Sequence, residues 1–142
     1  MMKKVYFAWS IRGDQQLTSI YPFIIAQLKE NGYEVITEHL NRQHATNIKE
    51  NPSDEDIFVR DVNLINEADI LVAEVSSPSH GVGREICYAQ FVRKIPVYLL
   101  SHHDKNMSAM LNGNLLINFA ESNRKCLWEN QKDIQEFIAY LK

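Results

Sequence analysis

ADILVAEVSSPSHGVGREI, residues 68–86, is the stretch that decides the fold class of this chain. Residues 68–75 are apolar at nearly every position, which is typical of a central parallel strand that is buried on both faces. A loop of small and polar residues follows, and from Gly81 to about Lys94 the pattern predicts a helix. A strand, a loop and a helix in this order form the repeating unit of α/β proteins.

The same alternation continues on both sides of this stretch. Strands are predicted at residues 4–10, 33–39 and 95–100, with weaker candidates at 115–119 and 124–128. Helices are predicted at residues 15–32, beginning or kinked near Pro22, at residues 53–68 and at residues 131–142. We therefore expect a single α/β domain over residues 1–142, doubly wound and flavodoxin-like or Rossmann-like, with a mainly parallel five-stranded sheet flanked by helices. Ligands of such folds bind beyond the carboxyl ends of the strands.

The composition argues against several classes of partner. The net charge of −3 is opposite in sign to the basic surface of a nucleic-acid binder, and no apolar stretch reaches membrane-spanning length. Cys87 and Cys126 form neither a metal-binding spacing nor a disulfide framework, so a reducing cytoplasm is the expected location. His102 and His103 are adjacent, with no further ligands at a helpful spacing. We therefore predict no metal site and no cofactor.

Asp61 interrupts the apolar stripe of the helix predicted at residues 53–68. The stripe consists of Ile57, Phe58, Leu64, Ile65 and Ala68. At 3.6 residues per turn, Asp61 falls in its middle, one turn from Ile57 and one turn from Ile65. A carboxylate there costs free energy unless it is paired or hydrogen-bonded. It is either a structural partner for a backbone donor or an arginine, or a carboxylate of a functional site.

Glu85 lies near the start of the helix predicted from Gly81. The helix dipole favours acidic residues in a first turn, which is the common structural explanation. The same dipole would help to keep a nucleophile ionised, and Gly81 and Gly83 would let a ligand approach the backbone closely. Neither the G-x-G-x-x-G dinucleotide fingerprint nor a P-loop is present in the sequence.

The turn after the first predicted strand contains polar groups suited to an anion. Ser10, the amides that follow it and Arg12 could hold a phosphate monoester, and Ser79 in the second loop could add a hydroxyl. The structural alternative is a solvated turn, because Gly-Asp is frequent in turns.

Four motifs together resemble the 2′-deoxynucleoside 5′-phosphate N-hydrolases, which belong with the nucleoside 2-deoxyribosyltransferases. They are VYFAWSIRGD (residues 5–14), TEH (37–39), DVNLINEADILVAEVSSPSHGVGREI (61–86) and MSAMLNG (107–113). The motifs occur in the same order and at similar spacings as in that family. The resemblance implies an enzyme that cleaves the N-glycosidic bond of nucleotides.

The resemblance also implies roles for three residues at the reacting sugar. Glu85 would attack the anomeric carbon of the deoxyribose. Asp61 would help to protonate the leaving base or would orient the nucleophile, and Tyr6 would pack beside the sugar. A retaining mechanism with one carboxylate as the nucleophile needs these residue types.

Further positions would bind the phosphate, the base and a second subunit. The phosphate would be held by Ser10, Ile11, Arg12, Gly13, Ser79 and Gly81. A neighbouring subunit would bring Ser108 into the site, with Met110 close by, so at least a homodimer is expected.

Trp9 stands where the hydrolases of the family have a glycine, and it would narrow the pocket or offer a stacking surface for a base. His39 is a second candidate for the base pocket. His80 and Arg84, which flank the glycines, are candidates for tuning selectivity.

Three alternatives to a deoxynucleotide hydrolase remain open at this point. A deoxyribosyltransferase would pass the same glycosyl-enzyme to another base. A ribonucleotide N-glycosidase would differ at the 2′ position, next to Tyr6. A nucleotide-binding module without turnover is permitted by the fold alone.

Overall fold

Five parallel strands form one sheet in the order β2-β1-β3-β4-β5. The strands are β1 (Lys4–Trp9), β2 (Glu34–Val35), β3 (Ile70–Glu74), β4 (Val97–His102) and β5 (Lys125–Trp128). The computed structural model describes residues 1–11, 17–38, 51–114, 117 and 124–141. This strand order is that of flavodoxin-like folds, in which ligands bind where the order reverses, beyond the carboxyl ends of β1 and β3. The predicted fold class is confirmed.

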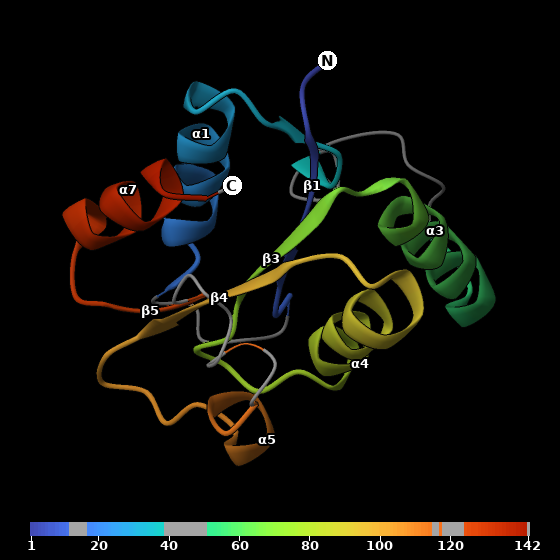
Figure 1. Ribbon diagram of the computed structural model, residues 1–142. Coiled ribbons are helices and arrows are strands. Elements are labelled where there is room, and N and C mark those ends of the chain that lie inside the picture. Colours follow the sequence, from blue (N-terminus) through green and yellow to red (C-terminus); the bar gives the residue numbers. More distant parts are fainter. Residues whose placement is uncertain (12–16, 39–50, 115–116, 118–123, 142) are drawn as a thin grey trace.

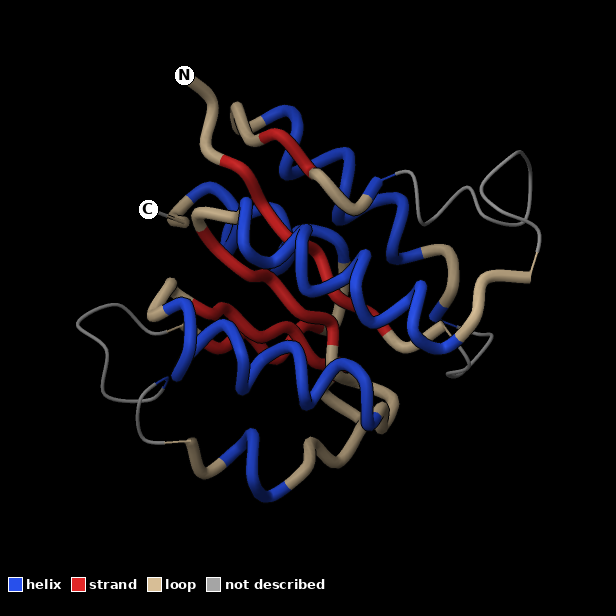
Figure 2. The backbone as a smooth tube through the Cα atoms, turned by 90° about the vertical axis from the view of Figure 1, so that its right-hand side faces the viewer, coloured by secondary structure: helices blue, strands red, loops and turns tan. Residues whose placement is uncertain are grey.

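Helices cover both faces of the sheet. α1 (Ile20–Glu30) and α7 (Gln131–Ala139) lie on one face, and α3 (Asp54–Glu67) and α4 (His80–Tyr88) lie on the other (Figure 1). α4 continues into the π-helical turn η2 (Ala89–Arg93), and the short helix α5 (Ala109–Asn112) follows β4. Figure 2, seen from the side of α3 and α4, shows helices lying across the strands. Within the described residues, no helix combines the length and the apolar character needed to span a membrane.

Alternate residues of β1 belong to the two different layers. Val5 and Phe7 pack into the core with α1 and α7, whereas Tyr6 and Ala8 pack into the core with α3 and α4. This is the period of two that a strand imposes on its side chains. The alternation directs Tyr6 to the face of the sheet that α4 covers.

The second strand is shorter than predicted, because among the described residues 33–38 of that prediction only Glu34 and Val35 pair with β1. Thr37 supplies the physical reason. Its buried hydroxyl accepts a hydrogen bond from the Phe7 N–H at 3.0 Å and donates one to the Phe7 carbonyl at 2.9 Å. The side chain therefore replaces the backbone partner that a longer strand would offer.

The helix boundaries follow the expected end signals. α1 begins at Ile20, so Pro22 lies in the first turn, where its missing N–H costs no helical hydrogen bond. Gly32, with a φ of 87°, follows the end of α1, as the Asn31-Gly32 pair predicts. Of the weak strand candidate at residues 115–119, only Ile117 is described, and it is helical; the other four residues lie outside the described part of the chain.

Glu74, the last residue of β3, ties the carboxyl ends of three strands together. Its buried carboxylate accepts hydrogen bonds from the Ser76 N–H at 2.8 Å, the Ser76 hydroxyl at 3.0 Å and the Trp128 indole at 2.7 Å. The Ser76 hydroxyl in turn accepts from the His102 N–H at 2.7 Å. Burial raises the pKa of Glu74, and these hydrogen bonds oppose the rise. The network fixes the start of the loop that leads from β3 to α4.

Candidate active site

A cavity of about 280 Å³ opens between α3 and α4. It is lined by Asp54, Ile57, Phe58, Asp61, Val62, Ile65, Gly81, Arg84, Glu85 and Tyr88. Both carboxylates that the sequence analysis singled out, Asp61 and Glu85, lie in this one cavity. Concave sites with apolar walls and a few convergent polar groups are the usual form of small-molecule sites.

The carboxylate of Glu85 meets the hydroxyl of Tyr6 at the floor of the site. Tyr6 comes from β1 and is 2% exposed. Its hydroxyl donates a hydrogen bond to Glu85. Tyr6 lies on the face of β1 that α4 covers, and Glu85 lies on α4, so the fold brings together two residues that are far apart in the sequence.

Burial raises the pKa of Glu85 to about 7. The hydrogen bond from Tyr6 opposes this rise, the negative charge of Asp61 adds to it, and the guanidinium of Arg60 opposes it. The pKa of Tyr6 is raised in turn, first by burial and then by the charge of Glu85, so its hydroxyl keeps its proton at neutral pH. Near pH 7, Glu85 is therefore divided between its acid and carboxylate forms.

Asp61 is both paired and part of the site. The Arg60 Nε donates to the Asp61 carboxylate at 2.8 Å, and the two side chains are 22% and 19% exposed. The sequence analysis did not include Arg60, because neighbouring residues on a helix do not normally face each other. Here the flexible arginine side chain reaches the carboxylate of the next residue, and its charge acts on both Glu85 and Tyr6.

The apolar stripe of α3 divides into two halves. Ile65 and Ala68 are buried in the core as expected, but Ile57 is 37% exposed and Phe58 is 50% exposed. The stripe is therefore not buried along its whole length. The N-terminal half of the stripe, with Ile57 and Phe58, forms a wall of the cavity. Asp61 lies between this wall and the buried half of the stripe.

Gly81 separates the nucleophile candidate from the serine at the helix start. A methyl group at Gly81 would lie 3.8 Å from Glu85 Oε1 and 3.9 Å from Ser79 Oγ. Ser79 is the N-cap of α4, and its hydroxyl accepts from the Val82 N–H at 3.2 Å. The glycine thus leaves open the space between the hydroxyl and the carboxylate.

The first turn is described only in part. Ser10, after β1, is buried, and Ile11 is 59% exposed. Arg12, Gly13 and the base-pocket candidate His39 lie outside the described residues.

Trp9 packs on the other side of the sheet from the carboxylates. Its ring stacks on Phe7 at 5.3 Å and lies 6.1 Å from the ring of Tyr21, against the core of α1 and α7. It is not among the residues that line the cavity between α3 and α4. This packing does not support its assignment to a base pocket.

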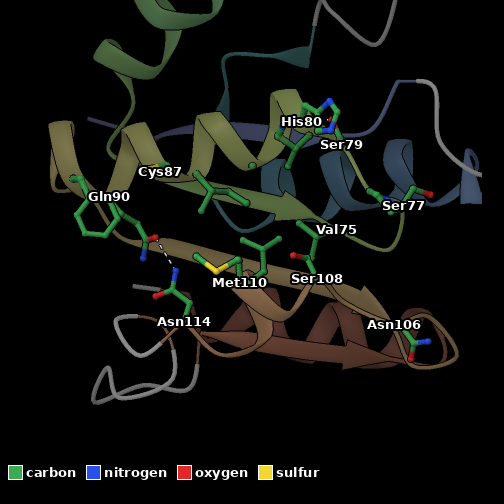
Figure 3. A pocket seen from close by; sticks show the side chains of 16 residues that line it. Val75, Ser77, Ser79, His80, Cys87, Gln90, Asn106, Ser108, Met110 and Asn114 are labelled. Atoms are coloured by element: carbon green, nitrogen blue, oxygen red, sulfur yellow. Dashed lines mark hydrogen bonds between the residues drawn. The ribbon is translucent and has the colours of Figure 1, made fainter.

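A second cavity, of about 390 Å³, contains Ser108 and Met110 (Figure 3). It lies between α4 and the segment that carries α5, and Ser79 and His80 also line it. The Gln90 side chain accepts a hydrogen bond from Asn114 at 2.9 Å across it. Within this single chain, Ser108 and Met110 therefore do not reach the cavity that holds the two carboxylates.

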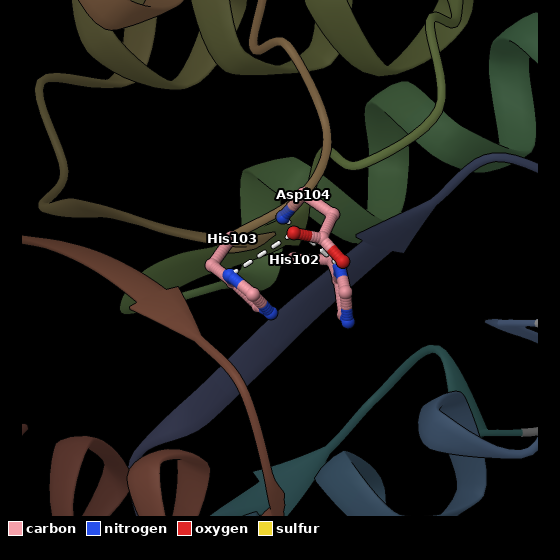
Figure 4. Close-up of side chains that lie close together, drawn as sticks. All are labelled: His102, His103 and Asp104. Atoms are coloured by element: carbon pink, nitrogen blue, oxygen red, sulfur yellow. Dashed lines mark hydrogen bonds and ion pairs between the residues drawn. The ribbon is translucent and has the colours of Figure 1, made fainter.

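His102, His103 and Asp104 form a small cluster at the end of β4 and in the turn that follows (Figure 4). The Asp104 N–H donates to His102 Nδ1 at 3.2 Å, and His103 Nδ1 lies 3.2 Å from the Asp104 carboxylate. The spacing of the two histidines alone did not indicate that Asp104 joins them. None of the three lines the cavity between α3 and α4.

Comparison with known proteins gives a consistent set of relatives. Residues 5–135 match the nucleoside 2-deoxyribosyltransferase family. A protein of Methanosarcina mazei that carries the name 2′-deoxynucleoside 5′-phosphate N-hydrolase 1 is 41% identical over 112 residues, which are 79% of this chain and 69% of that protein. One of the same name from Syntrophotalea carbinolica is 45% identical over 113 residues, 78% of each chain. The 5-hydroxymethyl-dUMP N-hydrolase of Tetraodon nigroviridis is 35% identical over 113 residues, 78% of this chain and 79% of that one.

Solved structures share the fold at lower sequence identity. A Clostridium botulinum CMP N-glycosidase superposes with a TM-score of 0.69 at 22% identity, covering 98% of this chain and all of the other. A 2-deoxyribosyltransferase of Bacillus psychrosaccharolyticus does so with a TM-score of 0.61 at 19% identity, covering 93% of this chain and 90% of the other. The match over residues 5–135, together with relatives at about 40% identity, confirms the resemblance that the four motifs indicated. This chain is a member of the nucleoside 2-deoxyribosyltransferase family.

Proposed function

We propose that the protein hydrolyses the N-glycosidic bond of 2′-deoxynucleoside 5′-monophosphates. The products are the free base and 2-deoxyribose 5-phosphate. The observation that carries the proposal is the presence of Glu85 and Asp61 in one cavity, with the Tyr6 hydroxyl bonded to Glu85 and with Gly81 between Glu85 and Ser79. Relatives at 35–45% identity carry the names of deoxynucleotide N-hydrolases, which supports the same substrate class.

The reaction proceeds in two displacements at the anomeric carbon. A carboxylate oxygen of Glu85 forms a bond to C1′ while the C1′–N bond breaks, and the electron pair of that bond leaves with the base, which takes up a proton. Water then attacks C1′, loses a proton and displaces Glu85 as a carboxylate. Ser10, Ile11, Arg12, Gly13, Ser79 and Gly81 hold the phosphate, and the open space at Gly81 lets the sugar lie between phosphate and nucleophile.

The direct test is to measure base release by chromatography. The purified protein is incubated separately with the four deoxynucleoside monophosphates, the ribonucleotides and the unphosphorylated deoxynucleosides, and with one deoxynucleoside plus a second base. Release from the deoxynucleoside monophosphates alone supports the proposal. Base exchange on unphosphorylated deoxynucleosides would instead make the protein a transferase, and equal release from ribonucleotides would make it a less selective glycosidase. Binding without any release would leave a nucleotide-binding module.

The pH dependence tests the ionisation of Glu85. Because Glu85 must be ionised to attack, kcat/KM should rise with pH and level off above about 7. The hydrogen bond from Tyr6 lowers the pKa of Glu85, so Tyr6→Phe should move the midpoint to higher pH. The substrate phosphate also titrates, with a pKa of about 6, but it does so equally with both enzymes.

A matched control for this measurement is Tyr88→Phe. The Tyr88 hydroxyl lines the same cavity but donates to Asn66 at 3.0 Å rather than to Glu85. Its removal should leave the midpoint unchanged. An unshifted midpoint in Tyr6→Phe would contradict the assignment of the ascending limb to Glu85.

We further propose that the active form is a homodimer in which each subunit completes the site of the other. Ser108 is the group supplied, with Met110 beside it. The surface around these residues includes exposed apolar side chains: Met110 is 84% exposed, and Phe91, which lines the same cavity, is 60% exposed. Apolar side chains grouped in this way favour contact with another protein surface.

Mixing two inactive variants tests the shared site. Equal amounts of Glu85→Gln and Ser108→Ala, allowed to exchange subunits, should regain about one quarter of wild-type activity, since about half of the dimers are hybrids and each hybrid has one intact site. A mixture of Glu85→Gln with Asp61→Asn is the control, because both residues line the cavity of one chain and no hybrid site is intact. No recovery in the first mixture would show that Ser108 does not act across an interface.

A further inference from the structure

Arg84 holds its guanidinium at the rim of the cavity that contains both carboxylates. The guanidinium carbon lies 5.4 Å from the centre of the Phe58 ring, which faces it from α3. Both side chains are exposed and both line the cavity. The pair therefore presents a cation and an aromatic face to whatever occupies the site.

The donors of Arg84 have no acceptor within the part of the chain that the structure describes. Two other arginines there have acceptors: Arg60 pairs with Asp61, and Arg93 donates to the Asn66 carbonyl. The Arg84 guanidinium lies over the face of the Phe58 ring, and a ring face leaves the N–H groups at the edge of the guanidinium available for hydrogen bonds. A guanidinium offers five N–H donors and no acceptor, so it suits a ligand oxygen.

The order of residues along α4 shows which part of a nucleotide would meet Arg84. Gly81, Arg84, Glu85 and Tyr88 are spaced at three and four residues and share one helix face. On the proposed function, the phosphate lies at the Gly81 end and the anomeric carbon at Glu85. The base then continues away from the phosphate, into the apolar part of the cavity between Phe58 and Tyr88.

We propose that Arg84 is a specificity-determining residue that binds the exocyclic carbonyl oxygen of the base, at C4 of a pyrimidine or C6 of a purine. This inference rests on the proposed function and names the substrate class within it. Those carbonyls lie on the edge of the base far from the glycosidic bond, as Arg84 lies at the rim. Bases with an amino group at the same position place N–H donors opposite the N–H donors of Arg84, so no hydrogen bond forms. The enzyme should therefore prefer thymine, uracil, guanine and hypoxanthine over cytosine and adenine.

The same contact assists the bond cleavage. When the C1′–N bond breaks, its electron pair enters the ring of the base and is conjugated through a C=C bond to the C4 or C6 carbonyl oxygen. A guanidinium at that oxygen meets a growing negative charge, and such preorganised contacts lower the barrier more than they improve ground-state binding. Loss of Arg84 should therefore lower kcat as well as raise KM.

Two matched substrate pairs test the proposal in the 142-residue chain. dUMP and dCMP differ at C4, and dIMP and dAMP differ at C6. With the wild type, kcat/KM should be about 10-fold to 100-fold higher for the carbonyl member of each pair. Arg84→Ala should remove this preference by slowing the carbonyl substrates, while Arg84→Lys, which keeps a donor and the charge, should retain part of it. Phe58→Leu should slow all four substrates without changing their ratio.

Each result has a distinct meaning. A wild type without preference within the pairs, or an Arg84→Ala variant that slows all four substrates equally, overturns the role of Arg84 while leaving the hydrolase function intact. A wild type that releases base from none of the four overturns the proposed function. In that case calorimetric binding of dUMP and dCMP to the wild type and to Arg84→Ala still decides whether Arg84 selects the carbonyl.

Discussion

Replacing Glu85 by glutamine is expected to abolish base release and, above pH 7, to make the folded protein more stable. The loss of turnover should be at least about 10⁴-fold, because removal of a covalent nucleophile leaves only positioning and electrostatic effects. Glutamine has the same shape, so the cavity and the contact with the Tyr6 hydroxyl remain. The enzyme should still bind the deoxynucleotide, which separates binding from chemistry.

The gain in stability follows from the shifted ionisation of Glu85. In the folded state its pKa is about 7, above the ordinary value of 4.5, so the folded protein binds this proton more tightly than the unfolded chain does. The contribution of the protonated form is present below about pH 4.5 and is lost as the pH rises to about 7. At about 1.4 kcal/mol per pKa unit, ionised Glu85 costs the fold about 3 kcal/mol at pH 8.

Denaturant unfolding at pH 5 and pH 8 measures this effect. Glu85→Gln should exceed the wild type in free energy of unfolding at pH 8 by far more than at pH 5. Glu136→Gln is the control, because this glutamate is exposed and makes only a surface contact of 3.8 Å with Lys132; it should change stability little at either pH. An equal effect of Glu85→Gln at both pH values would mean that Glu85 is not strained in its ionised form.

Periodicity located the parts of the site that interrupt a regular pattern. Asp61 is a carboxylate on an apolar stripe, and Glu85 follows a glycine-containing loop after the most apolar strand, so both were visible before the structure. The layer that Tyr6 faces follows from strand alternation. Each of these features depends on a local rule of helices or strands, and the fold then brings the three residues together.

Other features depend on contacts that sequence spacing does not encode. Arg60 pairs with its neighbour Asp61 because the long arginine side chain can reach the carboxylate, although neighbouring helix residues do not normally face each other. Thr37 ends β2 with a side-chain hydrogen bond that a propensity pattern cannot show. In the sequence, Glu74 is one residue of an otherwise apolar strand, yet its carboxylate accepts a hydrogen bond from Trp128, which is 54 residues away. The division of the α3 stripe into core and cavity wall likewise depends on where α4 is placed, since the exposure of Phe58 reflects packing rather than polarity.

Asp61→Asn is expected to lower kcat by about 100-fold to 1,000-fold, because it removes a fixed negative charge beside a sugar carbon that becomes positive in the transition state. Substrate binding should change much less, since that charge matters most when the glycosidic bond is breaking. The measurement is the separate effect on kcat and KM with the preferred deoxynucleotide. Asp54→Asn, which alters an exposed carboxylate of the same cavity, is the control and should retain most of the activity.

The pairing with Arg60 makes electrostatic support the expected role of Asp61, rather than donation of a proton to the base. The Arg60 Nε donates to Asp61 Oδ1 at 2.8 Å, so this oxygen of Asp61 accepts a hydrogen bond from a cation. A substrate with a nitrophenolate in place of the base separates the two roles, because this leaving group departs without protonation. Electrostatic support predicts that Asp61→Asn slows this substrate as strongly as it slows a deoxynucleotide. If Asp61→Asn instead reaches near-wild-type rates with the nitrophenolate substrate, Asp61 is the acid. The base would then leave in protonated form, which would contradict the negative charge that Arg84 is proposed to stabilise.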